Sequence, residues 1–275
     1  MKKNILLLCL LITIQTSFSQ EINYYGKFEQ GNSVIVKGEG IKWAWIDNEQ
    51  LKIDNGELFT LGFDAKETDS KILKFKDSDN KVHIKKIVLP KRKYNIQRIN
   101  NKKQQFGTTP DSLKERLKRE RAIAKEAKSM IGKYSDDVYK TGCVRPIKGG
   151  IVTSVFGSQR ILNGVPKNMH NGIDIAVPRG TPVRAMADGY VNLTTDNFYY
   201  AGNYIILDHG QGLNSMYLHL SKILVKKGQF VKKGDIIGKV GTTGRSTGPH
   251  LHWGVQWYSK RVDPETILKI NFANR

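Results

Sequence analysis

Short runs of strand-forming residues, separated by glycines, recur from Cys143 to the end of the chain, and this pattern constrains the fold most strongly. The runs are rich in aliphatic and aromatic residues and cover 183–187, 190–193, 204–207, 215–218, 230–231, 236–240 and 251–257. The glycines that separate them are Gly180, Gly189, Gly202, Gly228, Gly234 and Gly244. Because glycine permits tight turns that other residues resist, residues 143–275 are predicted to form a domain of antiparallel β-strands.

A second strand-rich region covers residues 20–90. Ile41, Trp43 and Trp45 alternate with a lysine and an alanine, which is the period-2 pattern of a half-buried strand. Further strand-like runs, with turn residues between them, cover 51–53, 58–63, 72–75 and 82–89. Strands this short and this regularly spaced predict a small N-terminal β-sandwich. The chain is therefore expected to be all-β apart from the segment between its two domains.

That segment, residues 91–142, is expected to be a basic linker with one helix. Residues 91–133 hold 14 Lys or Arg and four acids, a net charge of +10. Pro110 marks a helix start and Gly132 a helix end. The apolar residues between them form a narrow seam on a charged helix: Leu113, Leu117, Ala124, Ala127 and Ile131.

Two interpretations of this charge stay open. The favoured one is a solvated linker that packs lightly on a neighbouring domain, because charge runs are usually solvated. The other is electrostatic contact with an anionic wall polymer or membrane surface. Nucleic acid is not an expected partner, because no base-stacking motif interrupts the charge.

Residues 1–19 are expected to form an export signal. Lys2 and Lys3 precede a short apolar stretch, and Ser17 and Ser19 flank a single residue, which places the cleavage after Ser19. Cleavage removes two lysines and no acid from a chain of net charge +20, which leaves +18. No other apolar run approaches the roughly 20 residues of a membrane-spanning helix, so no transmembrane segment is expected after cleavage. The mature protein is expected in the periplasm or outside the cell.

Five of the six histidines lie between residues 170 and 252. His170 precedes Asp174 by four residues, in a stretch that reads as a loop entering a strand, with both side chains on one side. His250 and His252 are two residues apart, so in a strand both imidazoles point to the same face. Two imidazoles and one carboxylate around an open fourth position are the ligands of a catalytic zinc. The two pairs together therefore indicate a zinc site.

Three other reactive residues have structural explanations. His209 lies at a junction between a strand and a turn and is expected to hydrogen-bond the backbone. His219, between two leucines, would on its own be interpreted as a core histidine. Cys143 is the single cysteine left after cleavage, so it cannot form an internal disulfide and is expected to be a small buried hydrophobe.

Four sequence blocks together resemble the lysostaphin-type zinc metallopeptidases, the LytM-like peptidoglycan endopeptidases. They are HNGIDIA at 170–176, GTPV at 180–183, YLHL at 217–220, and TG at 243–244 with GPHLH at 248–252. Their order and spacing match over about residues 143–264, and the stretch at 94–99 resembles exported two-domain members of the family.

The resemblance implies a role for each of the five matching positions. His170, Asp174 and His252 would be the ligands of one Zn2+ per chain. His219 and His250 would be an unliganded catalytic pair that faces the scissile bond, with the proton role of each left open. His219 thereby changes from a core residue to a catalytic one.

The expected function is therefore that of a zinc-dependent endopeptidase that hydrolyses peptide bonds in peptidoglycan cross-links or stems during cell-wall remodelling. The alternative is a non-catalytic, wall-binding regulator of an amidase, which should lack one or more of the five residues. A third interpretation, a secreted peptidase directed against foreign walls, shares the chemistry and differs in its target.

Overall fold

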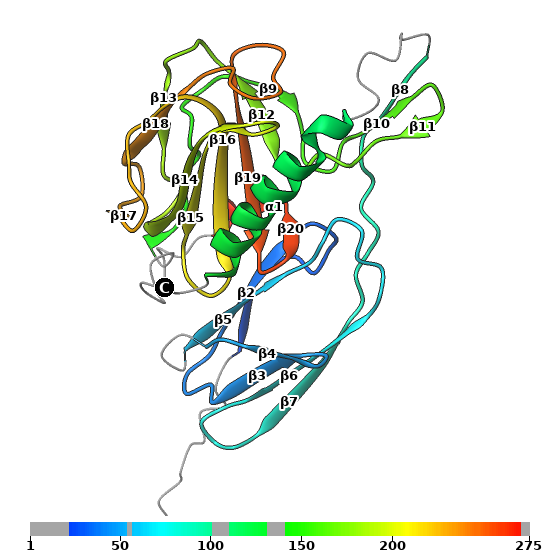
Figure 1. Ribbon diagram of the computed structural model, residues 1–275. Helices are drawn as coiled ribbons and strands as arrows, with labels where there is room; N and C mark the ends of the chain where they lie inside the picture. The colour runs from blue at the N-terminus through cyan, green and yellow to red at the C-terminus, as the bar shows by residue number, and fades with distance from the viewer. Residues whose placement is uncertain (1–21, 54–56, 101–109, 131–140, 271–275) are drawn as a thin grey trace, which may run out of the picture.

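The computed structural model describes residues 22–53, 57–100, 110–130 and 141–270. The expected export signal lies outside these residues. Strands dominate the described chain, and the all-β expectation is confirmed (Figure 1). Among the described residues, no helix is long and apolar enough to cross a membrane.

Two small antiparallel sheets form the N-terminal part. The first has the order β1-β2-β5 and consists of β1 (Asn23–Gly26), β2 (Ser33–Lys37) and β5 (Leu58–Gly62). The second has the order β4-β3-β6-β7 and consists of β3 (Trp43–Ile46), β4 (Glu49–Leu51), β6 (Lys71–Lys76) and β7 (Val82–Ile87). Phe59 of the first sheet and Phe75 of the second are both fully buried, and their ring centroids lie 5.8 Å apart. The two sheets therefore pack face to face, as expected of a small sandwich.

A single long helix follows, close to where the sequence predicts it. A 3-10 turn, η1 (Asp111–Leu113), leads into α1 (Lys114–Ser129). Leu117 and Ala127 of the predicted seam are buried, whereas Ile131 lies outside the described residues. Figure 1 shows α1 lying across the strands of the C-terminal sheet, where Ala127 packs in a cluster with Tyr204 and Met216.

The C-terminal part is one large sheet whose main path runs β17-β14-β15-β16-β19-β12-β9. Two further strands pair beside this path, β18 with β13 and β16, and β20 closes a hairpin with β19. The strands are β9 (Ile151–Ser154), β12 (Ile173–Ala176), β13 (Pro182–Arg184), β14 (Gly189–Phe198), β15 (Gly202–Asp208), β16 (Leu213–Ile223), β17 (Phe230–Val231), β18 (Ile236–Val240), β19 (His250–Trp257) and β20 (Lys260–Val262). A short helix, α2 (Pro264–Ile267), follows and is capped by the side chain of Asp263. All pairings in this sheet are antiparallel, as predicted.

A third small sheet joins the segment after the sandwich to the C-terminal part. In it, β8 (Ile96–Ile99) runs parallel to β10 (Gln159–Leu162), which in turn pairs with β11 (Val165–Pro166). The sequence did not predict these strands. The sheet bears on the site because β10 and β11 lead directly into the loop that carries His170.

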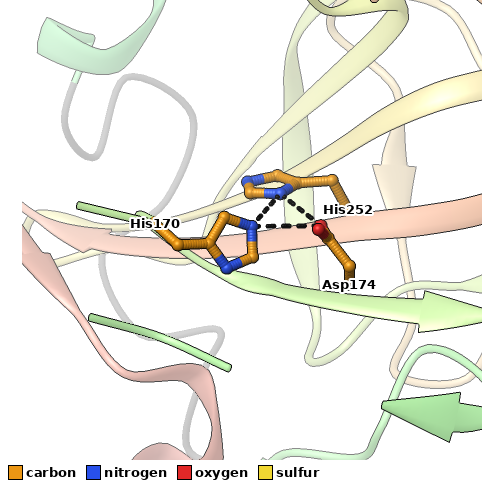
Figure 2. A group of neighbouring side chains, drawn as sticks. All are labelled: His170, Asp174 and His252. Atoms are coloured by element: carbon orange, nitrogen blue, oxygen red, sulfur yellow. Dashed lines mark hydrogen bonds and ion pairs between the residues drawn. The ribbon is translucent and has the colours of Figure 1, made fainter. Parts of the chain in front are cut away.

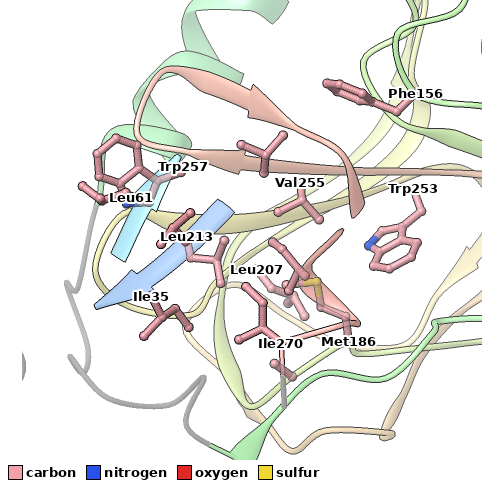
Figure 3. Close-up of a cluster of buried hydrophobic side chains, with 14 of the residues drawn as sticks. Ile35, Leu61, Phe156, Met186, Leu207, Leu213, Trp253, Val255, Trp257 and Ile270 are labelled. Atoms are coloured by element: carbon pink, nitrogen blue, oxygen red, sulfur yellow. The ribbon is translucent and has the colours of Figure 1, made fainter. Parts of the chain in front are cut away.

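The N-terminal and C-terminal parts share one hydrophobic core. Ile35 and Leu61 of the sandwich pack with Leu213 and Trp257 of the large sheet, as Figure 3 shows. The indole Nε1 of Trp257 donates a hydrogen bond to Thr60 Oγ1 at 2.8 Å. The domain boundaries at residues 19, 90 and 142 stay predictions, but the core is continuous across the expected boundary between sandwich and large sheet.

Candidate active site

Three side chains, two of them close in the sequence and the third almost 80 residues further on, converge on one point of the large sheet (Figure 2). His170 Nε2 lies 3.1 Å from Asp174 Oδ1 and 3.0 Å from His252 Nδ1. His252 Nδ1 lies 2.8 Å from Asp174 Oδ1. Both pairs predicted from the sequence, His170 with Asp174 and His250 with His252, are thus brought together. The triangle contains both members of the first pair and His252 of the second.

Strand pairing sets two corners of this triangle. Asp174 on β12 and His252 on β19 are direct partners in the antiparallel register, so their side chains emerge side by side from the same face. His170 belongs to the loop before β12, which two backbone hydrogen bonds hold against the turn before β10. Gly157 N–H donates to His170 O, and His170 N–H donates to Ser158 O, both at 2.8 Å.

The second nitrogen of His170 is held by the backbone. Nδ1 lies 3.1 Å from the carbonyl oxygen of Val155 and 3.1 Å from Ser154 Oγ. Because a carbonyl oxygen can only accept, the Nδ1–H donates to it, and the lone pair of Nε2 faces Asp174 and His252. Backbone carbonyls orient metal-binding histidines in this way, by accepting a hydrogen bond from the ring nitrogen that does not bind the metal.

Glycine at position 172 allows the loop to pass close to His252. A Cβ built on Gly172 would lie 2.4 Å from the carbonyl oxygen of Trp253 and 2.8 Å from His252 Nε2. Neither contact is tolerable for a real side chain, and the first is with rigid backbone. The glycine in the HNGID block therefore has a steric reason in this fold.

The electrostatics favour the protonation states that a metal needs. Burial by itself would raise the pKa of Asp174, but the neighbouring imidazoles of His170 and His252 outweigh it and hold the pKa of the carboxyl well below its usual range. Burial also lowers the pKa of His252, with Asp174 acting in the opposite direction. A carboxylate beside a neutral imidazole is the form in which these residues bind a metal.

The three donor atoms fit a zinc ion. Tetrahedral zinc with bonds of about 2.0 to 2.1 Å separates its ligand atoms by about 3.3 Å, and the three separations here are 2.8, 3.0 and 3.1 Å. Two imidazole nitrogens and one carboxylate oxygen are a ligand set of catalytic zinc sites, which leave a fourth position open.

His219 and His250 lie beside the triangle. Their ring centroids are 4.7 Å apart, and the His219 ring is 6.3 Å from that of His252. His250 Nε2 lies 3.9 Å from Asp174 Oδ1. Each Nδ1 faces a backbone carbonyl, that of Thr243 at 2.8 Å for His219 and that of Gly248 at 2.9 Å for His250. Each Nε2 is therefore left without its proton when the ring is neutral.

The backbone of His219 is strained. Its φ is +64°, a left-handed conformation in the interior of β16 that a residue with a Cβ rarely adopts. The pairing of β16 with β18 shifts register just after it, between Leu220 and Lys222. Such strain costs free energy and clusters at functional sites. Burial lowers the pKa of His219 to about 4. The hydrogen bond to the Thr243 carbonyl acts in the opposite direction, and the neighbouring histidines lower the pKa further.

Two residues expected to be structural lie away from this site. His209 is fully buried, and its Nδ1–H donates to Asp188 O at 2.7 Å, which is the expected backbone hydrogen bond. Burial raises the pKa of Cys143 to about 12, which agrees with an unreactive thiol. Sequence reasoning missed the orienting groups of the site, namely Ser154 and the carbonyls of Val155, Thr243 and Gly248, because no residue type marks a carbonyl acceptor.

Comparisons with known proteins agree with this geometry. Residues 168–264 match peptidase family M23. The chain is 53% identical over 104 residues to a Vibrio cholerae protein named peptidoglycan DD-endopeptidase ShyA, covering 37% of this chain and 24% of the relative. It is 43% identical over 99 residues to the DD-carboxypeptidase/endopeptidase Mpg of Neisseria meningitidis, covering 36% and 23%. The chain thus spans about a quarter of the length of these curated relatives.

One solved structure extends the similarity beyond the matched segment. A crystal structure of a peptidase M23 from Pseudomonas aeruginosa superposes with a TM-score of 0.67 at 28% identity and covers 90% of this chain and 97% of the other. The similarity in structure thus extends over the sandwich as well as the large sheet. Over residues 168–264, the C-terminal part of the chain belongs to peptidase family M23.

Proposed function

We propose that this chain is a zinc-dependent endopeptidase that hydrolyses peptide bonds in peptidoglycan cross-links or stems during cell-wall remodelling. The observation that carries the proposal is the convergence of His170, Asp174 and His252 into one triangle, with His219 and His250 beside it. The names of the relatives make the D,D cross-link the first bond to test.

Zinc, when bound by His170, Asp174 and His252, supplies a Lewis acid that lowers the pKa of water towards about 7 and polarises a carbonyl. The chain itself supplies orientation and proton transfer. Asp174 stays ionised, because its two histidine partners hold its pKa low. The second nitrogen of His170 donates to the Val155 carbonyl, which fixes the ring plane towards the other two ligands.

The pair of His219 and His250 handles the proton and the developing oxyanion. With its pKa lowered to about 4, His219 is neutral at pH 7, and its Nδ1–H is fixed on Thr243 O. Nε2 can therefore take a proton from the attacking water. His250 is anchored in the same way by Gly248 O, which directs its Nε2 into the site. A protonated imidazole can then donate to the oxyanion or to the leaving amine.

The cellular setting of this proposal is the envelope: the chain is exported to the periplasm or secreted, and peptidoglycan is its partner. Exposed basic residues of α1 would add contact with an anionic wall or membrane surface; among them are Lys118, Arg119, Arg121 and Lys125. Reversing several of these charges should weaken binding to sacculi and leave cleavage of small peptides unchanged.

Digestion of purified sacculi tests the proposal. Wild-type protein loaded with zinc should release muropeptides whose masses reveal the bond cleaved, and a chelator should stop the release. His219→Ala and His250→Ala should keep zinc and lose most of the turnover. Full hydrolysis by either variant would contradict its proposed role.

The alternative is a wall-binding regulator of an amidase that has no catalysis of its own. All five positions of the family pattern are occupied and lie together, which favours the enzyme. A zinc titration of the purified protein separates the two, because the regulator would bind no metal. A peptidase against foreign walls would be recognised by faster digestion of sacculi from other species.

A further inference from the structure

The outer face of the four-stranded N-terminal sheet carries an unusual surface, which we call the tryptophan–lysine face. In a strand, alternate residues point to opposite faces, and Ala44 and Ile46 of β3 point into the core. The other face therefore carries the remaining residues of the register across β4, β3, β6 and β7. They are Gln50, Trp43, Trp45, Ile72, Lys74, Lys76, Val82, Ile84 and Lys86.

The register places aromatic, cationic and aliphatic side chains in rows. Trp43 lies opposite Lys76, which lies opposite Val82. One step along the strands, Trp45 lies opposite Lys74, which lies opposite Ile84. Each row thus crosses three strands and offers an aromatic ring, an ammonium group and an aliphatic side chain in the same order.

These side chains face solvent. Trp45 is 36% exposed, Val82 48% and Ile84 67%. The other two tryptophans of the chain, Trp253 and Trp257, are 0% and 1% exposed. Large apolar side chains that gather on an exposed face, instead of occurring singly, mark a binding surface.

The charge of the face is positive and uncompensated. Its three lysines are accompanied by no acidic residue on the same face. Among the described residues, no carboxylate forms an ion pair with Lys74, Lys76 or Lys86. Lys71, which begins β6, is different, because its Nζ forms ion pairs with Asp47 Oδ2 at 3.2 Å and with Glu67 Oε1 at 3.0 Å.

We propose that the tryptophan–lysine face is a second binding site, which holds a glycan strand of peptidoglycan while the histidine site acts elsewhere on the wall. This inference rests on the proposed function, which makes peptidoglycan the substrate. The faces of sugar rings stack on the two indoles, and the lysines pair with the free carboxylates of the stem peptides. The charge complementarity between an acid-free cationic face and an anionic polymer selects this occupant.

The shape of the face fits a polymer better than a membrane. Trp43 is only partly exposed and Trp45 is about one-third exposed, so the rings rest on the sheet and do not protrude. Residues that insert into a bilayer form a continuous apolar face. Here the lysines of β6 separate the tryptophans of β3 from the aliphatic residues of β7. A flat platform with charges between its apolar groups suits an extended chain of sugars.

The face lies well away from the histidine site. Figure 1 shows β3, β6 and β7 at one end of the molecule, whereas β9 and β12 lie at the other. A strand held on the sheet would therefore leave the catalytic site open to neighbouring cross-links. Binding at this face can also be changed without contact to any metal ligand.

Sacculus binding by the full chain tests the proposal, in a His219→Ala background so that the polymer stays intact. Replacing both tryptophans (Trp43→Ala with Trp45→Ala) should weaken binding about tenfold or more, because it removes both stacking rings. Lys74→Glu with Lys76→Glu should do the same. The matched control is Lys226→Glu with Lys227→Glu, two exposed lysines in the turn before β17, which makes the same charge change and should leave the affinity near wild type.

A spectroscopic readout identifies the face directly. Because Trp253 and Trp257 are buried, a change of indole emission and of acrylamide quenching on titration with soluble glycan fragments reports on Trp43 and Trp45. The change should persist in zinc-free protein. Trp45→Phe should keep most of the affinity, and each variant should melt as wild type does.

Several outcomes would overturn the proposal. One is unchanged sacculus binding by the double tryptophan variant, and another is an equal loss of binding in the Lys226 and Lys227 control. A third is that the tryptophan and lysine variants lose binding to anionic phosphatidylglycerol vesicles but keep binding to sacculi. A fourth is a dimer of the chain that dissociates when Trp45 is replaced. Failure of the proposed peptidase activity is a separate result. A chain that cleaves nothing and still binds glycan through this face would support the inference while refuting the enzyme.

Discussion

The backbone conformation of His219 costs free energy of folding and places the imidazole in the site. Its left-handed backbone, with φ at +64°, turns the ring from the interior of β16 towards His250. Only glycine adopts such a conformation without cost. A residue that is strained, buried and hydrogen-bonded to a loop carbonyl is retained for a reason other than stability.

This strain makes a prediction about two substitutions of His219. His219→Gly and His219→Ala should both lower turnover by at least about 100-fold, since each removes the group proposed to transfer the proton. The glycine variant should be the more stable of the two by about 1 kcal/mol, because alanine keeps the strained φ. Thermal denaturation of the zinc-loaded variants measures the difference, and an alanine variant as stable as the glycine variant would show that the backbone is relaxed.

Gly172 supplies a second residue-level prediction. Gly172→Ala should displace His252 or the loop of His170, because its Cβ would lie 2.4 Å from the Trp253 carbonyl. The expected result is at least about tenfold weaker zinc binding, the loss that follows from misorienting a ligand. Competition with a fluorescent chelator gives the affinity. Gly248→Ala is the matched control, since a Cβ there meets nothing within 4 Å, and equal loss in both variants would refute the steric explanation.

The site was predictable from sequence in part. The spacing of His250 and His252 places both on one face of a strand. The resemblance implies that His252 is a ligand and His250 is not, and both roles stay predictions. The strain at His219 and the carbonyl partners of His170 and His250 were not predictable. They depend on loops at 155, 243 and 248, and a backbone carbonyl has no residue-type signal.

At the scale of elements, α1 is a docked helix. Asn192 of β14 donates from its amide to the carbonyls of Ala127 and Met130 at 3.1 and 3.2 Å, which satisfies the end of the helix. Glu120 is buried and accepts the backbone N–H of Tyr199 at 2.9 Å. The helix therefore packs on the large sheet through specific hydrogen bonds and not only through its apolar seam.

Lys128 in the last turn of α1 gives a pH-dependent prediction. Burial, reinforced by Arg261, lowers its pKa to about 8 from 10.5. Below pH 8 the lysine is charged in both the folded and unfolded states, so the full cost of burying the charge is present. Above pH 10.5 it is neutral in both, and the cost disappears.

Lys128→Met should therefore stabilise the protein at pH 7, by about 1 to 2 kcal/mol after allowance for partial exposure. The advantage over wild type should shrink as the pH rises from 8 to 10.5. Urea denaturation at a series of pH values measures it. An advantage that stays constant across this range would mean that the methionine acts through packing alone.

The strands were predictable where periodicity or glycine marks them. The runs at 204–207, 236–240 and 251–257 lie within β15, β18 and β19. β2 and β10 were missed for different reasons. β2 is buried on both faces for four of its five residues and shows no alternation, and β10 depends on a parallel partner about 60 residues away that no local pattern can reveal.

At the scale of the whole molecule, the sandwich and the large sheet share one core. Trp257 Nε1 donates to Thr60 Oγ1, which itself donates to Gln211 O at 3.2 Å. All three residues are buried, so the hydrogen bonds that join the two parts are shielded from solvent. The sandwich is therefore expected to melt together with the large sheet.

Thr60→Val tests this coupling. The substitution leaves the buried indole N–H and the Gln211 carbonyl without their partner, so unfolding should cost about 1 to 3 kcal/mol less. Calorimetry should show one transition that moves to lower temperature as a unit. Thr195→Val on β14, a partly exposed threonine of the large sheet, serves as control, and two separating transitions would contradict a shared core.

The most direct test of the whole account is the zinc content of the purified protein and its variants, measured by elemental analysis after dialysis. The account predicts one zinc per chain in wild type, in His219→Ala and in His250→Ala. It predicts little or none in His170→Ala, Asp174→Ala and His252→Ala. Zinc retained by a variant that lacks one of these three ligands, or lost when His219 or His250 is replaced, would contradict the assignment of the metal triangle.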